Sequence, residues 1–199
     1  MDRHQPARIL ARTTLHEGFL KLYRYRFDVQ KHGGGTHVLE WELMERGHAV
    51  AVLAYDPRRD AIVLGNEFRP GALIAGDHPF RDQLFAGALE PGESPLDAAI
   101  REVHEEAGLA LREPCIIHPG AYVSSGGTSE KIALVFGFVD ADGADDAIHG
   151  TDPGEDVRTV VMPAAQFIER VRAAAIDDCK TLVAGHWFAT RHDALRRSS

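Results

Sequence analysis

The sequence predicts an α+β fold in which a mixed β-sheet lies between helices as an α/β/α sandwich, with a small antiparallel β-unit at the N-terminus. Three observations support this class: strand patterns fill much of the chain, one amphipathic helix interrupts them, and two helix patterns end it. The length of 199 residues, with 44% hydrophobic and 26% charged residues, suits a globular protein with one core of ordinary size. We therefore expect an N-terminal β-strand unit over 1–46 and a main domain over 47–199.

The N-terminal unit is predicted as antiparallel strands over residues 7–14, 18–29 and 36–45. Glycine-containing segments separate these strands, and apolar residues partly alternate between Leu20 and Phe27. A ribbon this small is marginally stable alone, so we expect it to pack on its own domain or on a partner subunit.

The strands of the main domain are predicted over residues 48–55, 61–67, 82–86, 115–123 and 131–139. Apolar periodicity predicts two C-terminal helices, over 163–174 and 178–196. Between the last strand and these helices, the acidic, glycine-rich segment 140–156 is predicted as a surface loop that is too polar to pack.

The central segment, FAGALEPGESPLDAAIREVHEEAGL at residues 85–109, predicts a Gly/Pro-rich loop followed by a helix of about three turns. Ser94 is the expected N-cap, with Pro95 at the first helical position, Asp97 three residues after the cap and Gly108 at the end. The apolar stripe of this helix consists of Leu96, Ala99, Ile100, Val103 and Ala107. Three carboxylates lie together off that stripe: Glu102, Glu105 and Glu106.

Like charges four residues apart on a helix, as at Glu102 and Glu106, destabilise it by roughly 0.2 to 0.5 kcal/mol. A divalent cation such as Mg²⁺ reverses the sign of that interaction, because it takes carboxylate, phosphate and water oxygens as ligands. A solvated acidic face is the alternative for an isolated pair of glutamates.

The full pattern of residues around these glutamates favours a metal site over a solvated acidic face. Gly87 is followed after five residues by Glu93 and, after seven more, by the run Arg101-Glu102-Val103-His104-Glu105-Glu106-Ala107-Gly108-Leu109. This segment resembles the Nudix box at every defined position of that signature. The resemblance implies a Nudix-type fold, a Nudix hydrolase domain over 47–199, and hydrolysis of a nucleoside diphosphate linked to a further group.

The resemblance narrows to the bacterial ADP-ribose pyrophosphatases through segments outside the box. These are residues 45–48 (ERGH), 67–71 (EFRPG), 125–130 (SGGTSE), 148–150 (IHG) and 155–156 (ED). The subfamily implies Mg²⁺-dependent hydrolysis of ADP-ribose to AMP and ribose 5-phosphate. It also implies a homodimer whose N-terminal strands swap between subunits.

The resemblance carries individual roles onto this chain. The metal ligands it implies are the carbonyl of Ala86, the carboxylates of Glu102 and Glu106, and Glu155, holding two or three Mg²⁺ ions, with Mn²⁺ as an alternative. Arg101 would orient the carboxylates and Glu105 would assist them. The implied substrate-binding residues are Arg69 at the pyrophosphate, Arg46 as another substrate-facing arginine, Ser124 and Glu130 near the terminal ribose, the backbone of Ala88, Phe19 and Trp41 around the adenine, and Glu42.

Several of these roles compete with a structural alternative. Arg69 suits a pyrophosphate because guanidinium is a planar fork of donors, but it could form a surface salt bridge instead, and Arg46 likewise has a structural alternative. Phe19 and Trp41 could stack on a base for roughly 1 to 3 kcal/mol, or they could be core residues. Ser124 and Glu130 could make hydrogen bonds within their own loop.

The late loop departs from the family pattern. Close relatives carry two glutamates two positions apart there, whereas this chain has Pro153 and Glu155. Aligned without a gap, Pro153 falls on the position of the base, where proline cannot accept a proton, and Glu155 falls on the metal-associated position. More distant relatives place a single catalytic glutamate at about the position of Glu155, so the resemblance implies Glu155 as the general base, with Asp152 as the alternative.

The formal charge of -8 argues against general binding of nucleic acid or anionic membrane, because such surfaces are held chiefly by Lys and Arg. Cys115 and Cys179 are expected to be reduced and buried. Without a long apolar run or a signal-peptide core at the start, we expect a cytoplasmic protein. Two alternative functions stay open: hydrolysis of another nucleotide sugar such as GDP-mannose, and non-catalytic sensing of ADP-ribose.

Overall fold

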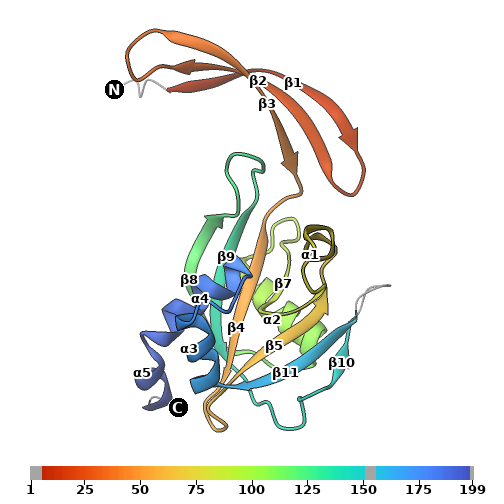
Figure 1. Cartoon of the computed structure of the whole chain (residues 1–199), viewed down its shortest axis with the longest axis vertical. Coiled ribbons are helices and arrows are strands. Elements are labelled where there is room, and N and C mark those ends of the chain that lie inside the picture. The colour runs from red at the N-terminus through yellow and green to blue at the C-terminus, as the bar shows by residue number, and fades with distance from the viewer. Residues whose placement is uncertain (1–5, 151–155, 198–199) are drawn as a thin grey trace. The chain divides into compact units, whose positions relative to one another are not determined.

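The computed structural model describes residues 6–150 and 156–197 of the chain. The chain forms two compact units (Figure 1). The first consists of Met1–Gly47 and Tyr122–Lys131, and the second of His48–Ala121 and Ile132–Ser199. The first unit therefore takes in a later segment of the chain as well as the N-terminal residues.

The described residues of the first unit form a three-stranded antiparallel sheet in the order β1-β2-β3. Its strands are β1 (Ala7–Glu17), β2 (Lys21–Gln30) and β3 (Thr36–Glu45), which confirms the three predicted strands. Alternate side chains of a strand share a face, so Tyr23, Tyr25 and Phe27 lie together on β2. Tyr25 and Phe27 stack with ring centroids 5.7 Å apart, and Trp41 of β3 is paired with Tyr25.

The described part of the second unit contains an eight-stranded mixed sheet, with the path β10-β11-β5-β4-β9-β8 and with β6 and β7 paired to β5 and β4. The strands are β4 (Ala49–Asp56), β5 (Ala61–Phe68), β6 (Phe80–Gln83), β7 (Phe85–Ala88), β8 (Arg112–Tyr122), β9 (Lys131–Phe138), β10 (Ile148–His149) and β11 (Val157–Pro163). The helices are α1 (Pro70–Ala75), α2 (Pro95–Ala107), α3 (Ala164–Arg172), α4 (Cys179–Ala189) and α5 (His192–Arg197).

Helices cover both faces of this sheet, which confirms the predicted sandwich (Figure 1). β4 is buried along its whole length and alternates between two cores. The core beneath α2 takes Val50, Val52 and Ala54. The core beneath α3 and α4 takes Ala51, Leu53 and Tyr55. An uninterrupted apolar strand is the sequence pattern expected for a sheet buried on both sides.

The hairpin of β4 and β5 opens into a wedge that positions the candidate site. The two strands pair only near their turn, where Ala54–Asp56 faces Ala61–Val63. Farther from the turn, β7 pairs with the first half of β4 and β6 pairs with the last half of β5. Because β4 and β5 separate in this way, β7 and the end of β5 belong to the same sheet without pairing with each other.

Several predicted boundaries are wrong. The predicted strand over 82–86 is two short strands, because the N–H of Leu84 donates to Oγ1 of Thr181 at 3.1 Å. The predicted helix over 178–196 is α4 and α5, and Thr190 at the break bonds its own hydroxyl to a backbone carbonyl of the preceding turn. The elements α1, β10 and β11 were not predicted.

The prediction that the segment 140–156 is too polar to pack is wrong for its described part. Ala141 and Ala144 are buried in the core beneath α2. The buried carboxylate of Asp56 accepts a hydrogen bond from the N–H of Ala141 at 2.9 Å. Ala141 and Ala144, which lie between aspartates in the sequence, therefore anchor the loop. The high average polarity of the segment does not reveal that these two residues are buried.

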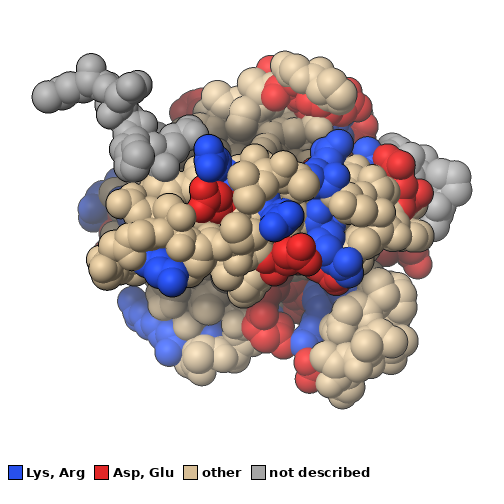
Figure 2. Space-filling view, turned by 90° about the horizontal axis from the view of Figure 1, so that it is seen from above, with Lys and Arg blue, Asp and Glu red and all other residues tan. Residues whose placement is uncertain are grey.

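The prediction of buried cysteines is also wrong, because Cys115 and Cys179 are both exposed. On the face shown in Figure 2, basic and acidic side chains are interspersed. None of the helices in residues 6–150 and 156–197 has the length and apolarity that a membrane span requires.

Candidate active site

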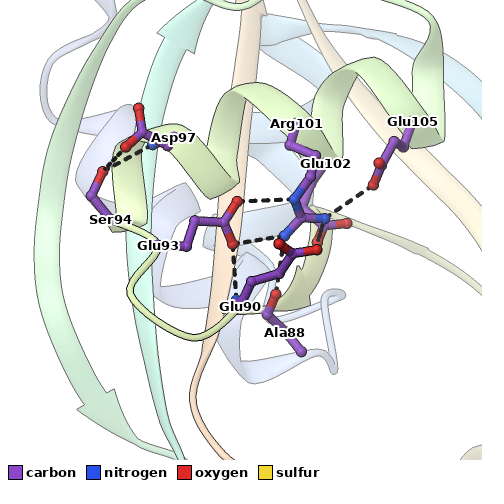
Figure 3. Close-up of polar contacts among 8 residues, drawn as sticks. All are labelled: Ala88, Glu90, Glu93, Ser94, Asp97, Arg101, Glu102 and Glu105. Carbon is purple, nitrogen blue, oxygen red and sulfur yellow. Dashed lines mark hydrogen bonds and ion pairs between the residues drawn. The ribbon is translucent and has the colours of Figure 1, made fainter.

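The helix α2 begins and ends as its sequence predicts. Ser94 is the N-cap: its Oγ accepts a hydrogen bond from the N–H of Asp97 at 3.2 Å and donates to the Asp97 carboxylate at 2.6 Å (Figure 3). Pro95 occupies the first helical position, and Gly108 ends the helix with φ of 65°, where glycine is favoured. The helix therefore presents Glu102 and Glu106 at a fixed place in the fold.

Glu102 and Glu106 are buried, at 6% and 7% exposure, on the side of α2 that faces the sheet. The expectation that they lie off the packed face is wrong, and Ile100, expected on that face, is 42% exposed. The helix lies so close to β7 that a Cβ added at Gly87 would be 1.8 Å from Oε1 of Glu102. A side chain at position 87 would therefore displace the Glu102 carboxylate from its place beside β7.

The backbone of β7 also contacts the second buried carboxylate. Oε2 of Glu106 accepts a hydrogen bond from the N–H of Ala86 at 3.1 Å. Ala86, Glu102 and Glu106, which the resemblance implies as metal ligands, therefore lie around one contact between α2 and β7.

Arg101 holds the surrounding carboxylates in place (Figure 3). It forms a two-pronged pair with Glu93, through Nε at 2.9 Å and Nη2 at 3.0 Å. Nη1 donates to Glu102 at 2.7 Å and to Glu105 at 3.0 Å. Nη2 also donates to the carbonyl of Ala88 at 3.1 Å, so this single guanidinium ties α2 to the loop and to β7.

These contacts shift the pKa values of the partners in opposite directions. The hydrogen bond from Arg101, followed by the one from the backbone of Glu90, lowers the pKa of Glu93. Glu93 in turn is the largest cause of a raised pKa of Arg101. The ion pair of Arg101 and Glu93 is therefore kept at neutral pH.

Glu106 behaves in the opposite way, because no lysine or arginine among residues 6–150 and 156–197 pairs with it as Arg101 pairs with Glu93. Burial, followed by the nearby charges of Glu67 and Glu102, raises the pKa of Glu106 to about 8. The N–H of Ala86 and the charge of Arg69 oppose that increase. A buried carboxylate beside two others is a place where added positive charge is stabilising.

Glu67 was not among the predicted site residues. Glu67 lies on β5, two positions before Arg69. Side chains two positions apart along a strand point to the same side, and this alternation could have identified Glu67 from the sequence. Oε1 of Glu67 pairs with Nη2 of Arg69 and also accepts from Nε2 of Gln83 at 2.5 Å. Nε of Arg69 is buried and has no hydrogen-bond partner among the described residues, so it remains available to an acceptor on a ligand.

The residues of this site fit a divalent cation. The donor set is hard oxygen, the like charges of Glu102, Glu106 and Glu67 need compensation, and Gly87 leaves space where a Cβ would otherwise stand. Within the described ranges, however, no three acidic, histidine or cysteine side chains already converge on one point. Substrate phosphates and water would supply the remaining ligands.

The first unit contains the other predicted substrate residues. Trp41 is half-exposed, and its Nε1 donates to the carbonyl of Gly126 at 2.7 Å. Phe19, in the turn between β1 and β2, is 93% exposed. Neither aromatic residue is part of the core. The carboxylate of Glu42 accepts from Arg24 at 2.8 Å on the exposed surface.

The segment 124–130 is folded onto β3. The carbonyl of Ser124 accepts hydrogen bonds from the N–H groups of Gly127 and Thr128, at 2.9 and 3.0 Å. Glu130 is 7% exposed, and its carboxylate lies 3.6 Å from Nε of Arg46. Arg46 and Glu130, both predicted to bind the substrate, are thus brought together as an ion pair.

The predicted site residues divide between the units. The second unit contains Arg69, Ala86, Ala88, Arg101, Glu102, Glu105 and Glu106. The first contains Phe19, Trp41, Glu42, Arg46, Ser124 and Glu130. The expected base Glu155 and its alternative Asp152 lie outside the described residues, as does Pro153.

The sequence of this chain is similar to the sequences of several bacterial pyrophosphatases. The ADP-ribose pyrophosphatase of Escherichia coli (strain K12) is 38% identical over 192 residues, which cover 94% of this chain and 90% of that protein. The ADP-ribose pyrophosphatase of Haemophilus influenzae is 34% identical over 201 residues, covering 98% and 91%. The GDP-mannose pyrophosphatase of Cronobacter sakazakii is 28% identical over 171 residues, covering 85% and 87%.

A solved structure supports the fold. The crystal structure of an ADP compounds hydrolase matches with a TM-score of 0.70 over 94% of this chain and 96% of that chain, at 19% identity. The model of the NUDIX domain matches residues 45–180, which include the wedge, α2 and the segment 124–130. This chain therefore belongs to the NUDIX domain family.

Proposed function

We propose that this protein hydrolyses the pyrophosphate bond of ADP-ribose to AMP and ribose 5-phosphate in a reaction that depends on Mg²⁺. The observation that carries the proposal is the buried pair Glu102 and Glu106 against the Gly87 backbone, with Arg101 fixing the surrounding carboxylates. We choose ADP-ribose as the substrate because two relatives named ADP-ribose pyrophosphatase are 34% and 38% identical to this chain along nearly its whole length.

In this reaction water adds to one phosphorus atom and the bond from that phosphorus to the bridging oxygen breaks. Two or three divalent ions, with Mn²⁺ as an alternative to Mg²⁺, would neutralise the phosphates and lower the pKa of bound water. The carbonyl of Ala86 and the carboxylates of Glu102 and Glu106 would hold the cations. Arg69 would donate its buried Nε–H to a phosphoryl oxygen.

Glu155 would remove the proton from the attacking water, with Asp152 as the alternative base. Trp41 and Phe19 would contact the adenine, with Glu42 beside Trp41 along β3. Arg46, Ser124, Glu130 and the backbone of Ala88 would bind the phosphates and the terminal ribose.

We further propose a cytoplasmic homodimer in which strands 1–46 swap onto the partner's main domain, 47–199. Exposed apolar residues of the small β-unit support this, since Ile9 is 63% exposed and Phe19 is 93% exposed. Light scattering of the purified protein tests the assembly, and a monomeric mass at micromolar concentration would contradict it.

The substrate is tested by incubating the protein with Mg²⁺ and, separately, ADP-ribose, GDP-mannose and a diadenosine polyphosphate. We expect ADP-ribose to be hydrolysed with the highest kcat/KM, yielding AMP and ribose 5-phosphate. In ¹⁸O-labelled water, one of the two products gains the label and identifies the phosphorus attacked. Preference for GDP-mannose would overturn the substrate assignment, and tight binding of ADP-ribose without products would favour a sensor.

A further inference from the structure

A buried chain of polar side chains leads from the start of α4 to the end of β5. Nζ of Lys180 donates to Oε1 of Gln83 at 3.0 Å and to the carboxylate of Asp178 at 2.8 Å. The Lys180 side chain is 13% exposed, and Gln83 is 2% exposed. These residues are outside the predicted site, and the reaction described above does not use them.

The chemistry of the two neighbours fixes the amide of Gln83 in one orientation. A lysine ammonium only donates hydrogen bonds, so it requires the oxygen end of the amide. Oε1 of Glu67 is the acceptor on the other side, so it faces the nitrogen end, and Nε2 of Gln83 lies 2.5 Å from it. Rotation of the amide would therefore place two acceptors against each other.

The chain ends on the arginine that the proposed reaction uses. The same Oε1 of Glu67 pairs with Nη2 of Arg69. This contact leaves the buried Nε of Arg69 without a partner among the described residues, as a donor held ready for an acceptor. The orientation of Arg69 thus depends on where the Glu67 carboxylate is held.

We infer that Lys180 is a positioning residue for Arg69, acting through the amide of Gln83 and the carboxylate of Glu67. The inference rests on the proposed function only in that Arg69 meets the pyrophosphate. Without the Lys180 ammonium, the Gln83 amide is held at its nitrogen end only, by Glu67. The position of the Glu67 carboxylate is then less restricted, and so is that of the Arg69 guanidinium that pairs with it.

Substitutions at 180 separate this role from a general effect on folding. Lys180→Met keeps the aliphatic length and removes the donor. Lys180→Arg restores a donor, and the cavity of about 340 Å³ lined by Lys180, Gln83 and Arg69 leaves room for it. Arg172→Met is the matched control, because it removes one exposed cation from α3.

The first readout is the NMR resonance of the Arg69 Nε–H group, assigned by its absence from Arg69→Lys and recorded without substrate or metal. We expect Lys180→Met to shift or broaden this resonance, and Lys180→Arg and Arg172→Met to leave it near its wild-type position. An unchanged resonance in Lys180→Met overturns the inference. Because no substrate is present, this result is independent of whether ADP-ribose is hydrolysed.

The second readout is the kinetics with ADP-ribose and Mg²⁺. We expect Lys180→Met to lower kcat/KM about five- to tenfold, mainly through a higher KM, because one charge-assisted contact to the substrate is weakened and not lost. Lys180→Arg should recover most of that loss. Equal losses in both variants would show that position 180 acts only through the start of α4, and would overturn the inference.

A double-mutant cycle with Gln83→Met tests the path of the effect. If Lys180 acts through Gln83, the double variant should be no more impaired than Gln83→Met alone. Additive losses would mean that Lys180 acts by its charge or through α4, and would refute the proposed path. If Gln83→Met does not fold, the NMR comparison and the rescue by arginine still decide.

Discussion

Replacing Glu106 by glutamine should stabilise the metal-free protein, and more so as the pH rises. The variant removes a buried charge but retains an oxygen that can accept from the N–H of Ala86. Burial, with the charges of Glu67 and Glu102, raises the pKa of Glu106 from 4.5 to about 8. The folded protein therefore favours the protonated carboxyl over its unfolded chain.

The sign of the pH dependence follows from linkage. A carboxyl whose pKa is raised by folding contributes stability below the unfolded value of 4.5, and that stability is lost as the pH rises through about 8. A shift of about 3.5 units corresponds to at most about 5 kcal/mol. Between about pH 6 and pH 9 the expected loss is about 3 kcal/mol, or roughly 5 to 10 °C in Tm for a chain of this size.

The assay is thermal unfolding of the wild type and Glu106→Gln in EDTA at several pH values from about 6 to 9. We expect the Tm of the variant to exceed that of the wild type by a margin that grows with pH. Added Mg²⁺ should raise the Tm of the wild type at high pH and raise that of the variant much less.

Glu93→Gln is the matched control, because the same chemical change is made at a carboxyl whose pKa Arg101 and the backbone of Glu90 lower. Its stabilising effect is complete above the unfolded value of 4.5 and is lost only at lower pH. This variant should therefore be less stable than the wild type by an amount that stays constant from about pH 6 to 9. A Glu106→Gln margin that does not grow with pH would refute the reasoning.

Three further substitutions test other contacts. Gly87→Ala should displace the Glu102 carboxylate, destabilise the fold by about 1 to 3 kcal/mol and weaken Mg²⁺ binding measured by calorimetry. Arg101→Lys cannot reproduce the two-pronged pair with Glu93 and should destabilise the protein by about 2 kcal/mol in urea unfolding. Asp56→Ala removes a buried carboxylate that accepts three backbone N–H groups, and should destabilise the protein by about 3 kcal/mol or more in the same assay.

Each of these expectations has a contradicting result. Unchanged Mg²⁺ affinity in Gly87→Ala would mean that the Glu102 carboxylate is not confined by β7. Wild-type stability of Arg101→Lys would mean that a single point charge serves the cluster as well as a guanidinium. An Asp56→Ala variant as stable as the wild type would show that the turn after β4 and the loop at Ala141 need no common anchor.

Local signals made α2 predictable from the sequence. Its cap at Ser94, the proline that follows and the glycine at 108 each satisfy a requirement of a helix end, and no distant contact overrides them. The continuous apolar run of β4 likewise predicted a strand covered on both faces. The layers of the fold follow from such elements.

The burial of Glu102 and Glu106 could not be predicted, because periodicity assigns every charged residue to the solvent side. Their side chains are buried because β7, a separate element, approaches α2 closely at Gly87. The role of Glu67 was missed for a related reason. Its contacts with Gln83 and Arg69 form only when the β4–β5 hairpin opens and β6 enters beside β5.

The short elements were missed because their signals are weak or mixed. β11 does alternate, with Val157 and Thr159 buried on either side of an exposed arginine, and this pattern could have been found. β10 has only two residues and exists through its pairing with β11. The loop before it packs through two alanines among aspartates, which average polarity does not reveal.

The central claim is that the buried carboxylates of α2 hold divalent cations for cleavage of a pyrophosphate. Its most direct test is the rate of ADP-ribose hydrolysis by Glu102→Gln and Glu106→Gln at saturating Mg²⁺, with folding checked by circular dichroism. We expect both variants to fold and each to lose about a hundredfold or more in kcat. Wild-type turnover in both variants would contradict the account.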